Sequence, residues 1–147
     1  MNHQVAELTS SGARLGFEDL AWLFRCDSRN RGIIRQGFDE AALLWKATQA
    51  TEGDILEIGR NHAGSTTLLA AASPGREVFS IDNAPKHDPK CDAFLAQPDM
   101  KGRVHLLVQD SRQAIANQRY GFLFIDGDHS FEGVLADVLA HWNALVR

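Results

Sequence analysis

Short apolar runs alternate with helix-like stretches along most of the chain. Four runs are rich in apolar residues, as is typical of strands covered on both faces: residues 54–58, 77–81, 103–108 and 121–125. The segments beside and between them show the apolar spacing or the stop signals of helices: residues 39–51, 65–72, 91–96 and 111–117. Strands separated by helices need crossover connections, and right-handed crossovers give a parallel sheet. We therefore predict an α/β fold with a doubly wound, mostly parallel sheet.

The two ends of the chain differ in how regular their patterns are. Residues 131–146 have the strongest helical period, with an apolar stripe that begins at Phe131 and reaches Trp142, and we expect this helix to pack against something. Residues 1–37 show only weak patterning and contain no visible chemistry. We predict that they form an N-terminal docking segment in front of a domain over residues 38–147.

Composition and charge narrow the class of protein. A chain of 147 residues with 44% hydrophobic and 23% charged residues has the size and mix of one soluble globular domain. The formal net charge is −4, so no basic excess favours a nucleic-acid partner. The first residues lack the pattern of a signal peptide, and no apolar run reaches the roughly 18 residues of a membrane helix. We expect a cytoplasmic protein that is not a membrane protein.

The loops after the four predicted strands are where chemistry is expected. Ligands of open parallel sheets bind beyond the carboxyl ends of the strands, near the point where the strand order reverses. Each of these loops carries an acidic residue or a glycine turn: residues 57–66, 81–83, 109–111 and 126–129. Packing of the fold does not require an acidic residue or a glycine turn in all four loops, so their presence indicates a ligand site.

The first of these loops admits several interpretations. Gly59 and Gly64 permit a tight turn, and Ser65 stands at a helix start, where free N–H groups favour an anion. A phosphate-binding P-loop would need Lys at the position of Ser65, and the dinucleotide fingerprint would need Gly at the position of Asn61. The glycines could also serve only the turn between strand and helix.

A second acidic position points to a nucleoside. Asp82 ends the second predicted strand, about 20 residues after Gly59, where a carboxylate can accept hydrogen bonds from both ribose hydroxyls. An Asp in this place can equally be a turn or capping residue. The spacing of Asp82 from the glycine turn at Gly59 favours the ribose-binding interpretation.

Four motifs together resemble those of class I S-adenosylmethionine-dependent methyltransferases, in the same order and spacing: Ile55–Gly59, Ile81–Asp82, Gln109–Ser111 and Phe124–Phe131. The last is similar to the Asp-Gly-x-His-x-aromatic signature of a subgroup that includes small-molecule and sugar O-methyltransferases. The resemblance runs from about Asp39 to the end of the chain. It implies a Rossmann-like sheet, S-adenosylmethionine as methyl donor and a small hydroxylated substrate.

The resemblance also assigns roles to residues in the four loops. It places Asp82 at the ribose, Asp110 and Ser111 near the adenine, and Asp126 near the methionine amine. The full set of expected donor-binding residues is Glu57, Gly59, Asn61, Gly64, Ser65, Asp82, Asp110, Ser111 and Asp126.

The last motif offers a base and a possible metal site. A neutral imidazole at His129 could remove the proton of an acceptor hydroxyl, although His129 could instead cap the final helix. Asp126 and Asp128 could together hold Mg²⁺. They could equally serve as an amine site and a helix cap.

The chain departs from the family pattern after residue 146. Family members continue with further strands that complete the sheet, whereas this sequence stops at Arg147. In the usual strand order, residues 121–125 would form an exposed apolar edge, which soluble proteins ordinarily cover. We therefore expect either a truncated methyltransferase or a second chain, as in a homo-oligomer, on that edge. The competing functional hypothesis is a non-catalytic remnant that binds the donor or only a partner chain.

Overall fold

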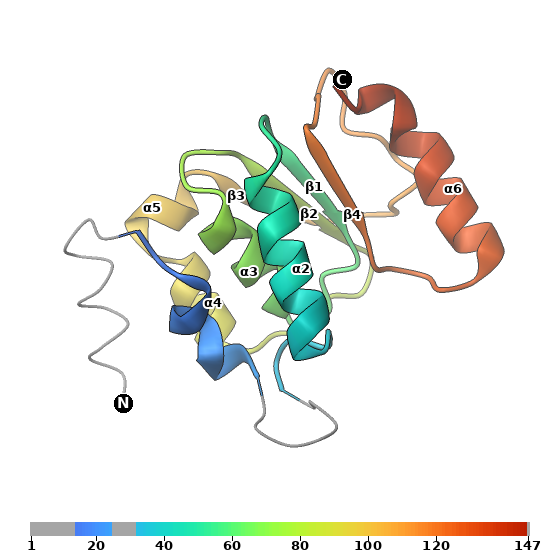
Figure 1. The fold of residues 1–147 in the computed structure, drawn as a ribbon. Coiled ribbons are helices and arrows are strands. Elements are labelled where there is room, and N and C mark those ends of the chain that lie inside the picture. The colour runs from blue at the N-terminus through green and yellow to red at the C-terminus, as the bar shows by residue number, and fades with distance from the viewer. Residues whose placement is uncertain (1–13, 25–31, 147) are drawn as a thin grey trace.

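A computed structural model of the protein describes residues 14–24 and 32–146. Figure 1 shows its elements along the chain. The strands are β1 (Ile55–Ile58), β2 (Val78–Asp82), β3 (Val104–Val108) and β4 (Phe122–Ile125). The α-helices are α2 (Phe38–Gln49), α3 (Gly64–Ala72), α4 (Pro89–Leu95), α5 (Pro98–Lys101) and α6 (Phe131–His141). The described residues also contain two 3₁₀ helices, η1 (Phe17–Leu23) and η2 (Trp142–Ala144).

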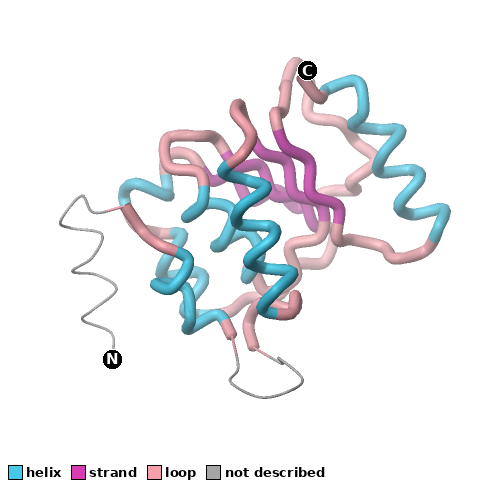
Figure 2. Tube along the Cα trace, viewed as in Figure 1, coloured by secondary structure: helices cyan, strands magenta, loops and turns pink. Residues whose placement is uncertain are grey.

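The strands within residues 32–146 form one parallel sheet in the order β3-β2-β1-β4. The predicted α/β fold with a doubly wound parallel sheet is therefore confirmed. Ile58 at the end of β1 pairs with Ile81 of β2 and Ile125 of β4. The carboxyl ends of the three strands thus lie side by side, and their loops begin at the same edge of the sheet (Figure 2).

One prediction of a helix is wrong. Residues 111–117 form turns, because the Asp110 carboxylate accepts the N–H of Arg112 in a local turn and Asn117 adopts a φ of 60°. The loop between β3 and β4 is therefore irregular. α5 was not predicted, since four residues are too few for a helical period.

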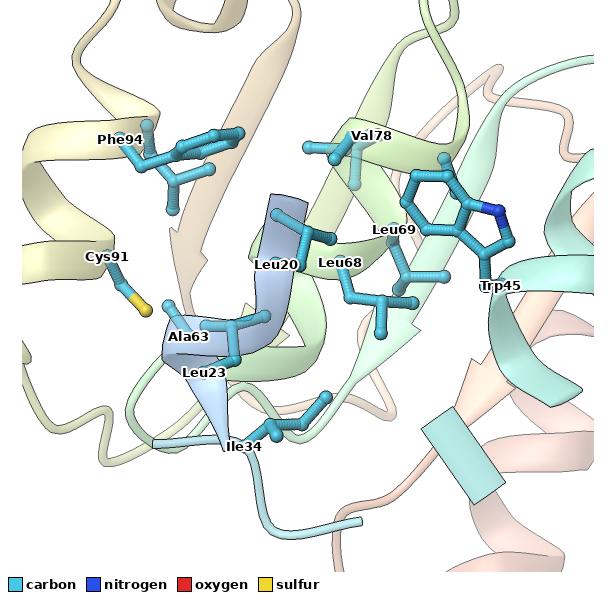
Figure 3. Close-up of a cluster of buried hydrophobic side chains, with 14 of the residues drawn as sticks. Leu20, Leu23, Ile34, Trp45, Ala63, Leu68, Leu69, Val78, Cys91 and Phe94 are labelled. Atoms are coloured by element: carbon cyan, nitrogen blue, oxygen red, sulfur yellow. The ribbon is translucent and has the colours of Figure 1, made fainter. Parts of the chain in front are cut away.

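The main core lies between the sheet and the helices η1, α2, α3 and α4. Its buried side chains include Leu20 and Leu23 of η1, which pack with Ile34, Trp45 of α2 and Leu68 of α3 (Figure 3). The described part of residues 1–37 thus shares one core with the helices that follow.

The opposite face of the sheet has a smaller apolar cluster and a helix of unusual orientation. The helix predicted over residues 131–146 is present as α6, which ends at His141 and is followed by η2. Its buried residues are Asp137 and His141. Its apolar stripe faces outward, with Phe131 76% and Leu139 68% exposed. In the described part of the chain, nothing covers that stripe.

β4 lies at the edge of the sheet, as the usual strand order predicts. Tyr120, just before β4, makes a parallel bridge to Leu145. Its N–H donates to Ala144 O and its carbonyl accepts from Val146 N, both at 2.9 Å. Residues 144–146 therefore lie beside the beginning of β4. No helix in residues 14–24 and 32–146 is long and apolar enough to cross a membrane.

Candidate functional site

A cavity of about 860 Å³ opens at the carboxyl ends of the strands. It brings together Gly59 after β1, Asp82 at the end of β2, Ser111 after β3 and Asp126 after β4. The volume is in the range of small-molecule and cofactor sites. Its position is that of ligand sites in open parallel sheets.

Most of the predicted site residues line this cavity. They are Gly59, Asn61, Gly64, Ser65, Asp82, Ser111, Asp126, Asp128 and His129. Glu57 and Asp110 are not among the lining residues. The four loops of the sequence motifs therefore form one site, while these two side chains lie outside its wall.

Gly59 allows two loops to meet. Its φ is +91°, which glycine adopts without strain. A Cβ at this position would overlap the carbonyl oxygen of Asp126 and come within 2.6 Å of Gly127 N. The glycine is thus required by the close approach of the β1 and β4 loops.

Glu57 anchors the start of α3 from below the cavity. This buried carboxylate accepts hydrogen bonds from Ser65 Oγ, Thr66 Oγ1 and Ser80 Oγ, each at 2.5 Å. Burial raises the pKa of Glu57, and the hydroxyl donors act in the opposite direction. Ser65 borders the cavity, but its hydroxyl is committed to Glu57.

Asp82 is held in one orientation by two backbone donors. Asn61 N donates to Oδ2 and Ala84 N donates to Oδ1, both at 2.8 Å. A carboxylate has about four acceptor positions, so ribose hydroxyls can still donate to it. The geometry fits the role expected for Asp82.

The loop after β3 makes hydrogen bonds to α6 and also within the loop. Ser111 Oγ donates to Asp137 Oδ1 at 2.6 Å, and Ser111 O lies 2.6 Å from His141 Nε2. These two contacts explain why α6 buries polar residues. Asp110 pairs with Arg112, whose hydrogen bonds lower the pKa of this carboxyl to about 2.

Asp126 is the carboxylate nearest the predicted base. Gln36 Nε2 donates to its Oδ2 at 2.5 Å, and His129 Nε2 lies 3.9 Å from its Oδ1. Burial raises the pKa of Asp126, and Glu40 of α2 adds to this effect, whereas His129 and Gln36 lower it. The His129 side chain is 82% exposed at the rim.

The helix cap after β4 is Ser130, not His129. Ser130 Oγ accepts from Gly133 N at 3.0 Å, and Asp128 in turn accepts from Ser130 N and Oγ. Asp128 is thus turned toward the start of α6. In residues 14–24 and 32–146 no three His, Cys, Asp or Glu side chains converge as metal ligands. The predicted Mg²⁺ site at Asp126 and Asp128 is not supported, because Asp128 serves the cap.

Sequence reasoning missed two contributions to the site. The segment Ile33–Gln36, before α2, lines the cavity. Arg60, only 5% exposed, donates from Nη1 to Ser80 O at 2.6 Å and Leu107 O at 3.3 Å, which ties β2 to β3 beside the cavity. The position of Arg60 directly after Gly59 was a usable signal. Gln36 gave none, because its partner is 90 residues away.

Comparisons with known proteins agree with this geometry. A family model described as a methyltransferase domain matches residues 56–147. None of the curated proteins compared with the sequence matches it significantly.

Solved structures show the same fold. The chain is 25% identical to an O-methyltransferase from Bacillus cereus in complex with SAH, with a TM-score of 0.61, covering 76% of this chain and 53% of that one. It is 22% identical to cofactor-bound Rv0187 from MTB, with a TM-score of 0.63, covering 97% and 61%. The glycopeptide N-methyltransferase MtfA complexed with S-adenosyl-L-methionine is 17% identical, with a TM-score of 0.55, covering 73% and 49%.

The chain spans about 40 to 60% of the length of the solved structures it matches. The family model covers most of this chain, and its matched region contains the β1, β2 and β4 loops that form the cavity. The protein therefore belongs to the methyltransferase-domain family, within the S-adenosylmethionine-dependent class I methyltransferases.

Proposed function

We propose that the protein binds S-adenosylmethionine in the cavity and methylates a hydroxyl group of a small metabolite or sugar. The observation that carries the proposal is the meeting of Asp82, the start of α3 and Asp126 in one cavity. Asp82 can accept hydrogen bonds from the ribose hydroxyls of the donor. The N–H groups at the start of α3 can bind its carboxylate, and Asp126 can pair with its ammonium. The similarity to an O-methyltransferase supports oxygen as the acceptor.

The residues present fit the donor. Asp82 presents an oriented carboxylate for the ribose. α3 begins without a side-chain cap among the described residues, so its first N–H groups can receive the donor carboxylate. Asp126 can pair with the donor ammonium, since opposite charges attract strongly in a partly buried site.

The protein positions the reacting groups and handles a proton. Bound S-adenosylmethionine supplies a methyl group on a sulfonium, which is transferred by in-line displacement. Asp82 and Asp126 hold the two ends of the donor, so the methyl group is presented at a fixed place. His129 accepts the proton of the acceptor hydroxyl as the oxygen gains the methyl group, and then releases it to water.

Calorimetric titration of the purified chain with S-adenosylmethionine and S-adenosylhomocysteine tests the binding step, with NAD as control. We expect micromolar binding of both sulfur ligands and none of NAD. Absence of binding in a folded sample would refute the proposal. Binding without methyl transfer to any hydroxylated acceptor would favour the alternative of a non-catalytic domain that retains the donor site.

We further propose that a second copy of the chain covers the apolar side of α6. Large apolar side chains of α6 and of the residues that follow it expose 40 to 76% of their surface: Phe131, Val134, Leu135, Leu139, Trp142 and Val146. Together they offer on the order of 600 Å², which approaches the ~800 Å² per partner of a standard interface.

The charges around α6 support an antiparallel pair of helices. Glu132 lies in the first turn of α6. Arg119 lies at the other end, where its Nη1 donates to Asn143 O at 2.6 Å. Antiparallel packing of two α6 helices would set Glu132 of each copy near Arg119 of the other. α6 lies beside β4, the outer strand of the sheet (Figure 1), and the same partner is proposed to cover the β4 edge as well.

A further inference from the structure

We propose that Gln36 is a positioning residue for donor binding, whose amide orients the Asp126 carboxylate toward the amino-acid end of S-adenosylmethionine. The inference rests on the proposed function and deepens it. It also makes the segment before α2, residues Ile33–Gln36, a contributor to the binding site.

The strap Ile33–Gln36 has a fixed place in the fold. Ile34 is 1% exposed, and its N–H donates to Leu23 O at 3.2 Å. The strap crosses directly over the start of α3, where a Cβ on Gly64 would lie 2.6 Å from Ile34 Cα. Gly64 therefore lets the strap backbone reach the wall of the cavity.

Gln36 joins this strap to the loop after β4. Its Nε2 donates to Asp126 Oδ2 at 2.5 Å, and both residues line the cavity. Among the described residues, the other side chains that act on Asp126 are His129, which lies 3.9 Å from Oδ1, and Glu40 on α2. A donated N–H stabilises the ionised form of a carboxylate and limits its rotation. Gln36 thus favours the charged form of Asp126 and holds its carboxylate in one orientation, in a half-buried place near Glu40.

The position of Asp126 predicts which part of the ligand depends on Gln36. Asp82 lies in another loop of the cavity and takes the ribose, whereas Asp126 takes the ammonium of the amino-acid end. Loss of the Gln36 amide should therefore weaken ligands that carry this end and spare ligands that lack it. A uniform loss would indicate a structural role instead.

Calorimetry with two ligands separates these cases. S-adenosylhomocysteine carries the amino-acid end, and 5′-methylthioadenosine has the same nucleoside without it. For Gln36→Ala we expect the Kd of S-adenosylhomocysteine to rise about tenfold, in line with loss of one hydrogen bond to a charged group. The Kd of 5′-methylthioadenosine should change less than about twofold. Asp126→Asn should reproduce the same selective loss.

Gln49→Ala is the matched control, because Gln49 is an exposed glutamine at the end of α2 that does not line the cavity. Should Gln36→Ala fail to fold, Gln36→Asn shortens the side chain by one methylene and withdraws the amide from Asp126, so the same selective loss is expected. Equal loss of both ligands, or no loss of either, would overturn the role of Gln36 while leaving the proposed function intact. Failure of the unaltered protein to bind S-adenosylhomocysteine would instead refute the proposed function itself.

Discussion

Gly59→Ala tests how the site is built, because two different strains meet at this position. Gly59 has a φ of +91°, and an L residue in the left-handed region costs about 1–2 kcal/mol. The added Cβ would also lie 2.6 Å from Gly127 N and overlap Asp126 O. These are backbone atoms that cannot rotate away, and such overpacking adds about 1–3 kcal/mol. We expect the free energy of unfolding to fall by about 2–5 kcal/mol.

Substitutions at two other glycines distinguish the strain of a positive φ from the strain of an overlapping Cβ. Gly75 has a φ of +79°, but a Cβ there would have nothing within 4 Å. Gly75→Ala should therefore lose only about 1–2 kcal/mol, from the backbone strain alone. Gly102 has an ordinary φ of −83° and open space around its Cβ. Gly102→Ala should be neutral or slightly stabilising.

Urea and thermal unfolding of the three variants measure these differences. For a chain of this size a loss of 1 kcal/mol lowers Tm by roughly 2–4 °C, so Gly59→Ala should melt on the order of 10 °C lower. The variant should also lose affinity for S-adenosylhomocysteine, since the β1 and β4 loops must part. Equal stability of Gly59→Ala and Gly75→Ala would refute the argument that the two loops are in contact.

Three further predictions concern catalysis, pH and assembly. His129→Ala should lower kcat by about 10²–10⁴-fold and leave the Kd of S-adenosylhomocysteine unchanged; unchanged turnover would remove His129 as the base. Burial raises the pKa of Asp126 above the ordinary value of 3.8, and donor binding needs the charged form. Affinity should therefore decline on acidification at a higher pH than for an exposed Asp, and a flat profile from pH 8 to 4 would contradict the pairing with the ammonium. Sedimentation should show a dimer that Leu139→Glu dissociates, with Leu43→Glu as an exposed control on α2; a well-folded monomer at all concentrations would rule out the dimer.

The sequence alone determined the fold class and the place of the site. The strands β1 to β4 could be found because apolar runs and their stop signals are local features of the chain. Parallel topology then requires the loops after these strands to share one edge. For this reason Gly59, Asp82 and Asp126 could be assigned to one site before any contact was known.

Only the tertiary structure decided which partners the carboxylates around the cavity meet. Glu57 turns toward Ser65, Thr66 and Ser80 beneath the cavity, and Asp128 turns toward Ser130 at the start of α6. Neither direction is visible in a motif, because residue type and spacing do not specify which of several hydroxyl or N–H donors a carboxylate will meet.

The orientation of α6 and the contact of Gln36 were also beyond the sequence. The apolar period of α6 predicts a buried stripe, yet Asp137 and His141 bind Ser111 and turn the polar side inward. Gln36 reaches Asp126 across 90 residues. Periodicity records only how neighbouring residues alternate, whereas these contacts depend on which distant segments the packed layers bring within hydrogen-bond distance.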